Sequence, residues 1–177
     1  MIHQGKMKSG RVNCKEVLEK YPVEKYKVQE KKRSGTYRGK QSHHVIQNAH
    51  FQVPRGTTVE SICPKYKEGD APCIPLSDGT NPKTEHGRVS KMQKARSKEY
   101  RARTKNPTYS EARQDAKDQL MAKPKPGLSA PEAECILKQV DKYFDETCKG
   151  MGSLRKPGSR STKPKAKSRV GKKGRSR

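Results

Sequence analysis

Hydrophobic residues recur three or four positions apart in three stretches of the second half of the chain, the spacing that places side chains on one face of a helix. The clearest stretch follows Ser129 and Glu132, which form an S-x-x-E capping box. Its apolar stripe consists of Ala133, Ile136, Leu137, Val140 and Phe144. We therefore predict a helix here with one face packed into a core.

Two further helices are predicted before that stripe. One begins at Asn81, a favourable N-cap residue followed by Pro82, and covers residues 83–102. The other spans residues 109–122, with Ser110 as its expected cap. The aligned apolar positions are Val89, Met92 and Tyr100 in the first, and Ala112, Ala116 and Leu120 in the second.

The first half of the chain has shorter apolar runs. Residues 13–21 predict a short helix, residues 23–29 alternate apolar and polar side chains as a strand does, and residues 31–40 are typical of a basic turn. Two apolar runs follow. Residues 45–53 are expected to continue a strand or to form a short buried segment, and residues 73–76 to form a short strand.

The composition limits the size of the core. Of 177 residues, 28% are hydrophobic, and 42 Lys and Arg stand against 18 Asp and Glu, a formal net charge of +24. We therefore expect a basic, partly ordered N-terminal segment (residues 1–40), a compact domain (41–150) and a disordered basic tail (151–177). The positive excess indicates a polyanionic partner, namely DNA, RNA or an acidic protein.

The cysteines favour a cytosolic setting, and the apolar runs include no membrane or secretory segment. No run is long enough to cross a membrane, and no secretory h-region follows the N-terminal lysines. The five cysteines contain no C-x-x-C pair, so reduced thiols are expected rather than a zinc ribbon or a disulfide framework. An approach of Cys63 to Cys73 across a loop stays open.

The last 25 residues hold eleven basic residues and no acidic one. Such a segment cannot fold alone, and it is expected to act as an electrostatic arm that contacts phosphates without reading bases. The basic residues are Arg155, Lys156, Arg160, Lys163, Lys165, Lys167, Arg169, Lys172, Lys173, Arg175 and Arg177.

Three histidines carry the candidate chemistry. His43 and His44 come just before an apolar run, and His86 falls in the first turn of a predicted helix, an order typical of a ββα-metal nuclease site. Phosphodiester hydrolysis needs a base that works near pH 7 and a Lewis acid at the phosphate, and neutral imidazole can be the base or hold the metal ion. Adjacent strand residues point opposite ways, so we expect a distortion at the strand end, or the use of different ring nitrogens, to bring both histidines to one substrate. His50 is expected to be a loop or partly packed residue.

The segments SHHVIQNAHF and APCIPLSDGTNPKTEHGRVSKMQ resemble the SHH-type branch of the HNH/endonuclease VII nuclease superfamily, toxin modules of bacterial polymorphic toxins and secreted effectors. The resemblance covers about Ser42 to Phe144 and implies an α+β fold, a small ββα-metal (His-Me finger) core with additional α-helices. Ser90 stands where such a helix often carries a second histidine, which favours a sparsely ligated Mg²⁺-type site over a three-histidine zinc site. The matching residues are His43, His44, Gln47, Asn48, Ala49, Ala71, Pro72, Ile74, Leu76, His86 and Gln93.

The same resemblance implies roles for these residues. His44 is expected to be the general base and His43 a metal ligand or phosphate contact, although an exchange of these two roles stays open. His86 is the expected second metal ligand, and Asn48 is expected to orient the base or the metal-bound water. The supporting residues are Gln47 and Gln93. The expected ion is Mg²⁺, with Zn²⁺, Mn²⁺ and Ni²⁺ as alternatives.

The leading hypothesis is a metal-dependent endonuclease toxin that cleaves DNA without strong sequence preference. The alternatives are an RNase of the same fold and a non-enzymatic basic nucleic-acid-binding protein. RNA-binding modules usually display aromatic side chains for base stacking, whereas this chain has two Phe and no Trp. The resemblance further implies an acidic immunity protein as partner, export by a dedicated route such as type VI secretion or within a larger effector, and action in the target-cell cytoplasm.

Overall fold

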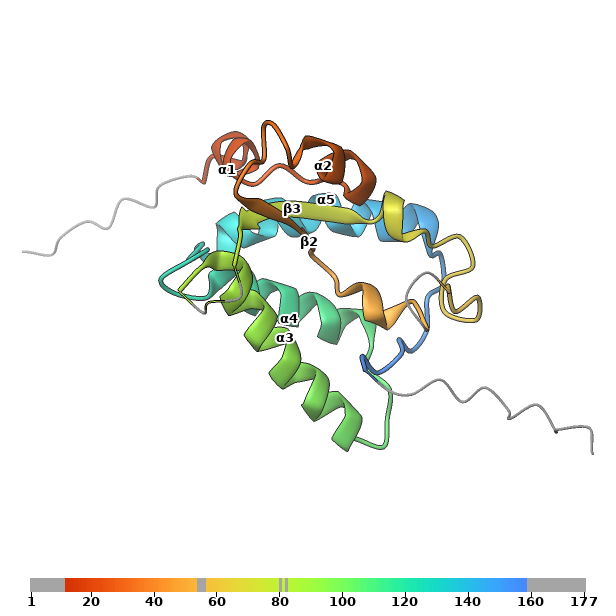
Figure 1. The fold of residues 1–177 in the computed structure, drawn as a ribbon. Helices are drawn as coiled ribbons and strands as arrows, with labels where there is room; N and C mark the ends of the chain where they lie inside the picture. The colour runs from red at the N-terminus through yellow and green to blue at the C-terminus, as the bar shows by residue number, and fades with distance from the viewer. Residues whose placement is uncertain (1–11, 54–56, 80, 82, 159–177) are drawn as a thin grey trace, which may run out of the picture.

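The computed structural model describes residues 12–53, 57–79, 81 and 83–158. This part of the chain is an α+β fold of five α-helices and a three-stranded antiparallel sheet (Figure 1). The helices are α1 (Cys14–Lys20), α2 (Tyr26–Lys32), α3 (Glu85–Ala102), α4 (Tyr109–Met121) and α5 (Ala130–Thr147). The strands are β1 (Glu24–Lys25), β2 (Lys40–His44) and β3 (Pro72–Ser77). None of the described helices is long and apolar enough to span a membrane.

The central strand of the sheet is β3, which pairs with β1 on one side and with β2 on the other. Its residues are buried up to Leu76, and the pairing with β2 places His43 opposite Ile74 and His44 opposite Cys73. In Figure 1, α1 and α2 lie above the sheet, and α3 and α4 lie below it. The order β2, β3, α3 is therefore the strand–strand–helix unit expected from the sequence.

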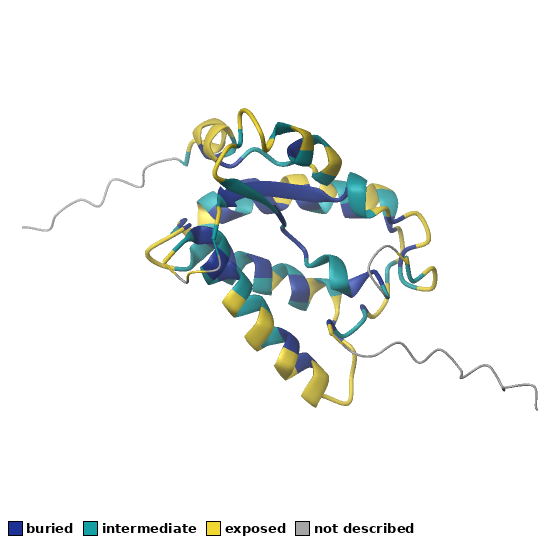
Figure 2. Ribbon diagram, viewed as in Figure 1, coloured by how far each residue is buried: buried dark blue, intermediate teal, exposed yellow. Residues whose placement is uncertain are grey.

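The core lies between β3 and α5. The rings of Phe51, Tyr66 and Phe144 stack with centroids 4.5 and 5.1 Å from Phe51, and Ile74 and Leu76 are fully buried. Figure 2 shows β3 as buried along most of its length and the outer surface of α3 as largely exposed. The low proportion of apolar residues in the chain is thus enough to form a core, because these residues are concentrated in one cluster.

The three helices predicted in the second half are confirmed, with two corrected starts. The N-cap of α3 is Thr84, not Asn81, and Pro82 lies outside the described residues. The N-cap of α4 is Thr108, not Ser110, because Thr108 forms a reciprocal capping box with Glu111. The box predicted at the start of α5 is present.

The strand predicted over residues 23–29 is wrong except for its first part. Glu24 and Lys25 pair with β3, and the helix α2 then begins at Tyr26. The buried amide of Gln29 donates hydrogen bonds to the carbonyls of Pro22 and Cys73, which ties α2 to the sheet. These tertiary contacts decide the conformation of a segment whose own pattern suits either a strand or a helix.

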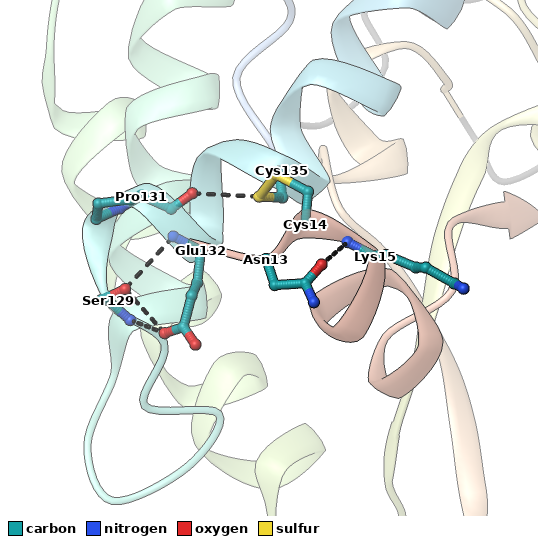
Figure 3. Close-up of a disulfide and its surroundings, with 7 residues drawn as sticks. All are labelled: Asn13, Cys14, Lys15, Ser129, Pro131, Glu132 and Cys135. Carbon is teal, nitrogen blue, oxygen red and sulfur yellow. Dashed lines mark hydrogen bonds between the residues drawn. A yellow bond between two sulfur atoms is a disulfide. The ribbon is translucent and has the colours of Figure 1, made fainter. Parts of the chain in front are cut away.

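The expectation of reduced thiols is also wrong. Disulfides join Cys14 to Cys135 and Cys63 to Cys148, so that both ends of α5 are linked to distant parts of the chain. Figure 3 shows the first of these bonds beside the capping box of α5. Cys73 is a buried free thiol, so it does not pair with Cys63. The bonded cysteines are 121 and 85 residues apart, and such pairs cannot be identified from their spacing in the sequence alone.

The tail boundary expected at residue 151 needs a correction. Leu154 is fully buried, and its amide donates a hydrogen bond to the carbonyl of Pro107. Residues 151–158 therefore belong to the packed part of the molecule. The basic residues from Arg160 onward lie outside the described residues.

Candidate active site

A cavity of about 650 Å³ opens where β2 ends and α3 begins. It is lined by residues from β2, from the loop after it, from α3 and from the C-terminal segment. The six motif residues that were expected to have a role in the site all border it: His43, His44, Gln47, Asn48, His86 and Gln93. The fold thus gathers residues that are up to 50 positions apart into one concave site.

His43 lies on the side of the sheet that faces α3. Its ring centroid is 6.0 Å from that of His86, and its Nε2 is 3.4 Å from Nε2 of Gln93. The pKa of His43 is lowered to about 3, mainly by burial and in smaller part by the nearby His86 and His44. His43 is therefore neutral at physiological pH, with one ring nitrogen able to accept a hydrogen bond or to ligate a metal ion.

His44 lies on the opposite side of the strand. Its ring stacks on Tyr26 of α2 with centroids 4.6 Å apart, and its Nε2 is 3.4 Å from the carbonyl oxygen of Glu68. When Nε2–H donates to that carbonyl, Nδ1 is the basic nitrogen of the ring. Stacking and the carbonyl together hold His44 in a fixed orientation.

The distortion expected at the end of β2 is not observed. His43 and His44 both stay in regular register with β3. The two histidines still border one cavity, whose lining includes His86 near His43 and Glu68 near His44. The alternative expectation, the use of different ring nitrogens, is compatible with the contacts of Gln93 and Glu68.

The loop after β2 is held by side-chain amides. Asn48 donates through Nδ2 to Gln52 at 2.9 Å and accepts through Oδ1 from the Tyr66 hydroxyl at 2.5 Å. Gln47 accepts a hydrogen bond from Ser97 of α3 at 3.3 Å. These contacts fix the wall of the cavity between β2 and α3.

Two residues outside the predicted site hold the first turn of α3 in place. Glu85 accepts hydrogen bonds from the Tyr21 hydroxyl at 2.6 Å and from the backbone N–H of Ser77 at 2.8 Å. Burial alone raises the pKa of Glu85, but the hydrogen bonds from Tyr21 and Ser77 outweigh it, so the net pKa is lowered and the carboxylate stays charged. Because His86 is the next residue, this network sets the position of its backbone. The sequence gave no indication of this role, because a glutamate at the start of a helix, such as Glu85, is usually exposed to solvent.

Gly87 allows the same turn to close. A Cβ atom there would lie 2.1 Å from the carbonyl oxygen of Asn81 and 2.9 Å from Oγ1 of Thr84. Thr84 accepts the cap hydrogen bond from the Gly87 N–H at 3.1 Å. The glycine next to His86 is therefore required by a close backbone approach.

Arg155 is a cavity residue that the sequence placed in the tail instead. Its backbone N–H donates a hydrogen bond to the carbonyl of His50, and its own carbonyl accepts one from Nδ1 of His50 at 2.9 Å. Its guanidinium donates to the carbonyls of Ala49 and Gln52. His50 is buried, as expected for a packed residue, and it anchors the C-terminal segment rather than taking part in the site.

The donor set at the cavity fits a sparsely ligated ion. Among the described residues, no group of three or more His, Cys, Asp or Glu side chains is placed to hold a metal ion. The ring centres of two histidines that share one ion are no more than roughly 6–7 Å apart, given nitrogen–metal distances of about 2.1 Å. His43 and His86, with centroids 6.0 Å apart, meet this limit. Substrate oxygens and waters would complete the coordination of a hard cation such as Mg²⁺.

A family model described as HNH/Endo VII superfamily toxin with a SHH signature matches residues 37–145, more than half of the chain. No curated protein and no solved structure matches the chain. The helices α1 and α2 and the C-terminal segment 151–158 lie outside the matched range, although they pack against it.

Proposed function

The chain belongs to the HNH/Endo VII superfamily of toxins with a SHH signature, and on this premise we propose that it is a metal-dependent endonuclease that hydrolyses phosphodiester bonds of DNA. The observation that carries the proposal is the convergence of His43, His44 and His86 on one cavity. A basic chain of net charge +24 favours a polyanionic substrate without favouring a particular base sequence.

In this proposal, His43 and His86 hold a divalent ion, and His44 is the general base. A bound ion supplies Lewis-acid stabilisation of the phosphate and of the leaving oxygen. The low pKa of His43 suits a ligand and makes it a weak base, which supports this assignment over the exchanged one. His44 accepts the proton of the water that attacks phosphorus, while the bond from phosphorus to the leaving oxygen breaks. Glu68 and Tyr26 orient the His44 ring, Asn48 and Gln47 shape the cavity wall, and Gln93 orients His43.

The proposal includes a protein partner and an export route. A toxic nuclease needs an inhibitor in the cell that makes it, and an acidic immunity protein would associate quickly with this basic surface. Secretion by a dedicated bacterial system, type VI or as part of a larger effector, followed by action in the target-cell cytoplasm, accords with membership of the toxin family. Two disulfides support exposure to an oxidising compartment, since such bonds are rare in cytosolic proteins.

Nuclease assays test the proposal directly. Purified protein is incubated with plasmid DNA and, separately, with total RNA, with Mg²⁺ and with EDTA. Wild type should nick and linearise the plasmid only when the ion is available, and His44→Ala should lose about 10²–10⁴-fold in rate, the usual contribution of a general base. His86→Ala should lose activity together with affinity for Mn²⁺, measured by calorimetry, whereas His44→Ala should still bind the ion and the DNA.

Three results would contradict the proposal in different ways. Cleavage of RNA with intact plasmid would move the assignment to an RNase of the same fold. Tight DNA binding without cleavage, unaffected by EDTA, would leave a non-enzymatic binding protein. Near wild-type nicking by both His44→Ala and His86→Ala would show that the chemistry lies elsewhere.

A further inference from the structure

The helix that carries His86 has a polar face that extends beyond the catalytic cavity. Ser90, Gln93 and Ser97 follow His86 at intervals of three and four residues, so they share one side of α3. Lys94 and Arg101 flank this line on the same side, one turn and three turns after Ser90. Ser90 and Gln93 are half-buried, and Ser97 is buried against Gln47 in the loop after β2.

A second hollow, of about 340 Å³, lies along this stripe. Ser90, Lys94, Ser97 and Arg101 line it. Gln47, Gln93 and Gly158 border both this hollow and the catalytic cavity. The two spaces are therefore neighbours with a shared wall. A nucleic-acid strand that ran from the histidines along α3 would enter the second hollow.

The charge that lines the second hollow favours a polyanion. Within the part of the chain that the structure describes, no carboxylate lines the second hollow, which carries the exposed basic groups of Lys94 and Arg101. A third hollow beside α3, of about 190 Å³, is instead lined by Arg96 and by three acidic residues that are ion-paired with it. Those residues are Glu99, Asp115 and Asp118. The three carboxylates outnumber the single Arg96, so a phosphate chain that crossed that hollow would face a net negative charge.

The wall of the second hollow is built by the C-terminal segment. Arg101 donates a hydrogen bond to the carbonyl of Pro157 at 2.8 Å, which holds Gly158 against α3. Leu154 is buried and anchors the same segment to the domain. The hollow is thus formed by packed residues, although its far wall lies outside the range matched by the family model.

We propose that this second hollow is a backbone subsite that binds a phosphodiester of the substrate strand a few nucleotides away from the one that is cleaved. Lys94 and Arg101 supply the positive charge, and Ser90 supplies a neutral donor. Lys94 lies eight residues after His86, about 12 Å along the helix, which corresponds to roughly three to four nucleotides of strand rise. The inference rests on the proposed nuclease function, and it adds the path by which the strand passes over α3.

Paired charge-removal variants test the subsite. Lys94→Gln and Lys91→Gln remove one charge each from exposed positions of the same helix, but Lys91 lines neither hollow. Binding of a DNA duplex is measured at several salt concentrations in the His44→Ala background, and cleavage is measured with an intact His44. For Lys94→Gln we expect the slope of log K against log salt to fall by about 0.9, the value of one phosphate contact. KM should rise while kcat at saturating DNA is kept, and Lys91→Gln should behave as wild type.

A second measurement locates the phosphate. Duplexes are prepared with a single neutral methylphosphonate at successive positions. KM should rise when the methylphosphonate lies a few nucleotides from the cleaved bond. This interference should disappear in Lys94→Gln, since that variant no longer has the charge that the phosphate pairs with. Equal effects of Lys94→Gln and Lys91→Gln in a protein that cleaves DNA would overturn the subsite. Absence of cleavage by wild type would instead overturn the proposed function on which it rests.

Discussion

At the scale of single residues, His50 shows how burial converts a titratable group into a source of pH-dependent stability. Burial lowers the pKa of His50 to about 4 from the ordinary value of 6.5. Above pH 6.5 the ring is neutral in both states, and the folded protein has its full stability. Between pH 6.5 and 4 the unfolded chain takes up a proton that the folded protein does not, so the free energy of unfolding falls as the pH is lowered.

The expected size of this effect is about 3 kcal/mol for a pKa difference of roughly two units or more. His50→Asn removes the titration and keeps an N–H donor for the carbonyl of Arg155. Urea unfolding of both proteins at pH 7 and pH 4.5 should show a smaller loss of stability on acidification in His50→Asn. The buried His43 titrates in both proteins, so the difference isolates His50. Parallel pH profiles would mean that the His50 pKa is not depressed in the folded protein.

At the scale of elements, the first turn of α3 depends on a glycine. In Gly87→Ala the new methyl group meets the carbonyl of Asn81, so the residues before α3 or the helix itself must shift. Overpacking of this kind costs about 1–3 kcal/mol of stability. Because His86 lies in the displaced turn, cleavage should fall more than the population of folded protein does.

Gly35→Ala is the matched control, since a Cβ atom at Gly35 meets no atom within 4 Å. This variant should change stability by no more than about 0.5 kcal/mol, as surface substitutions do. Thermal unfolding and plasmid nicking of the two variants provide the comparison. A Gly87→Ala protein that equals Gly35→Ala in both assays would show that the turn accommodates a methyl group without moving His86.

The elements also show which parts of the fold the sequence could predict. Stripes such as Ala133 to Phe144 repeat often enough to predict a helix, and the S-x-x-E box gave its start. Thr108 and Ser110 are both good caps, and the choice depended on which one has Glu111 three residues later. Residues 23–29 fit a strand or a helix until the buried contacts of Gln29 with the sheet decide between them.

The candidate site was predictable to a different degree. The motif order predicted that His43, His44 and His86 would meet, and they border one cavity because β2, β3 and α3 follow one another in the chain and pack together. It could not reveal Tyr21 and Glu85, whose hydrogen bond spans 64 positions. Arg155 was hidden for a similar reason, since its partners Ala49 and Gln52 are more than 100 positions away.

At the scale of the whole molecule, segments outside the family match complete the domain. The disulfide between Cys14 and Cys135 fastens α1 to α5. Tyr21, directly after α1, then reaches Glu85 beside His86. The oxidised cross-link is in this way connected to the position of a candidate metal ligand through one helix and one hydrogen bond. The second disulfide joins Cys63 to Cys148 and holds the start of the C-terminal segment near the core.

The last prediction concerns that C-terminal segment and separates its packed part from the basic residues after it. Deletion of residues 159–177 removes nine of the eleven basic residues of the tail and keeps Leu154 and Arg155. DNA binding should weaken equally for all sequences, and the salt slope should shrink by up to about 0.9 for each phosphate that the deleted residues bind. Cleavage at low salt and saturating DNA should survive, because the cavity is intact.

Deletion from Ser153 onward removes the buried Leu154 and the Arg155 wall of the cavity as well, so it should lower stability by about 2–5 kcal/mol and abolish cleavage. Thermal unfolding, binding titrations at several salt concentrations and nicking rates for both truncations test this division. An unchanged salt slope after the shorter deletion would show that the basic residues beyond Gly158 do not contact the DNA, and full activity after the longer one would show that Arg155 and Leu154 are dispensable for the site.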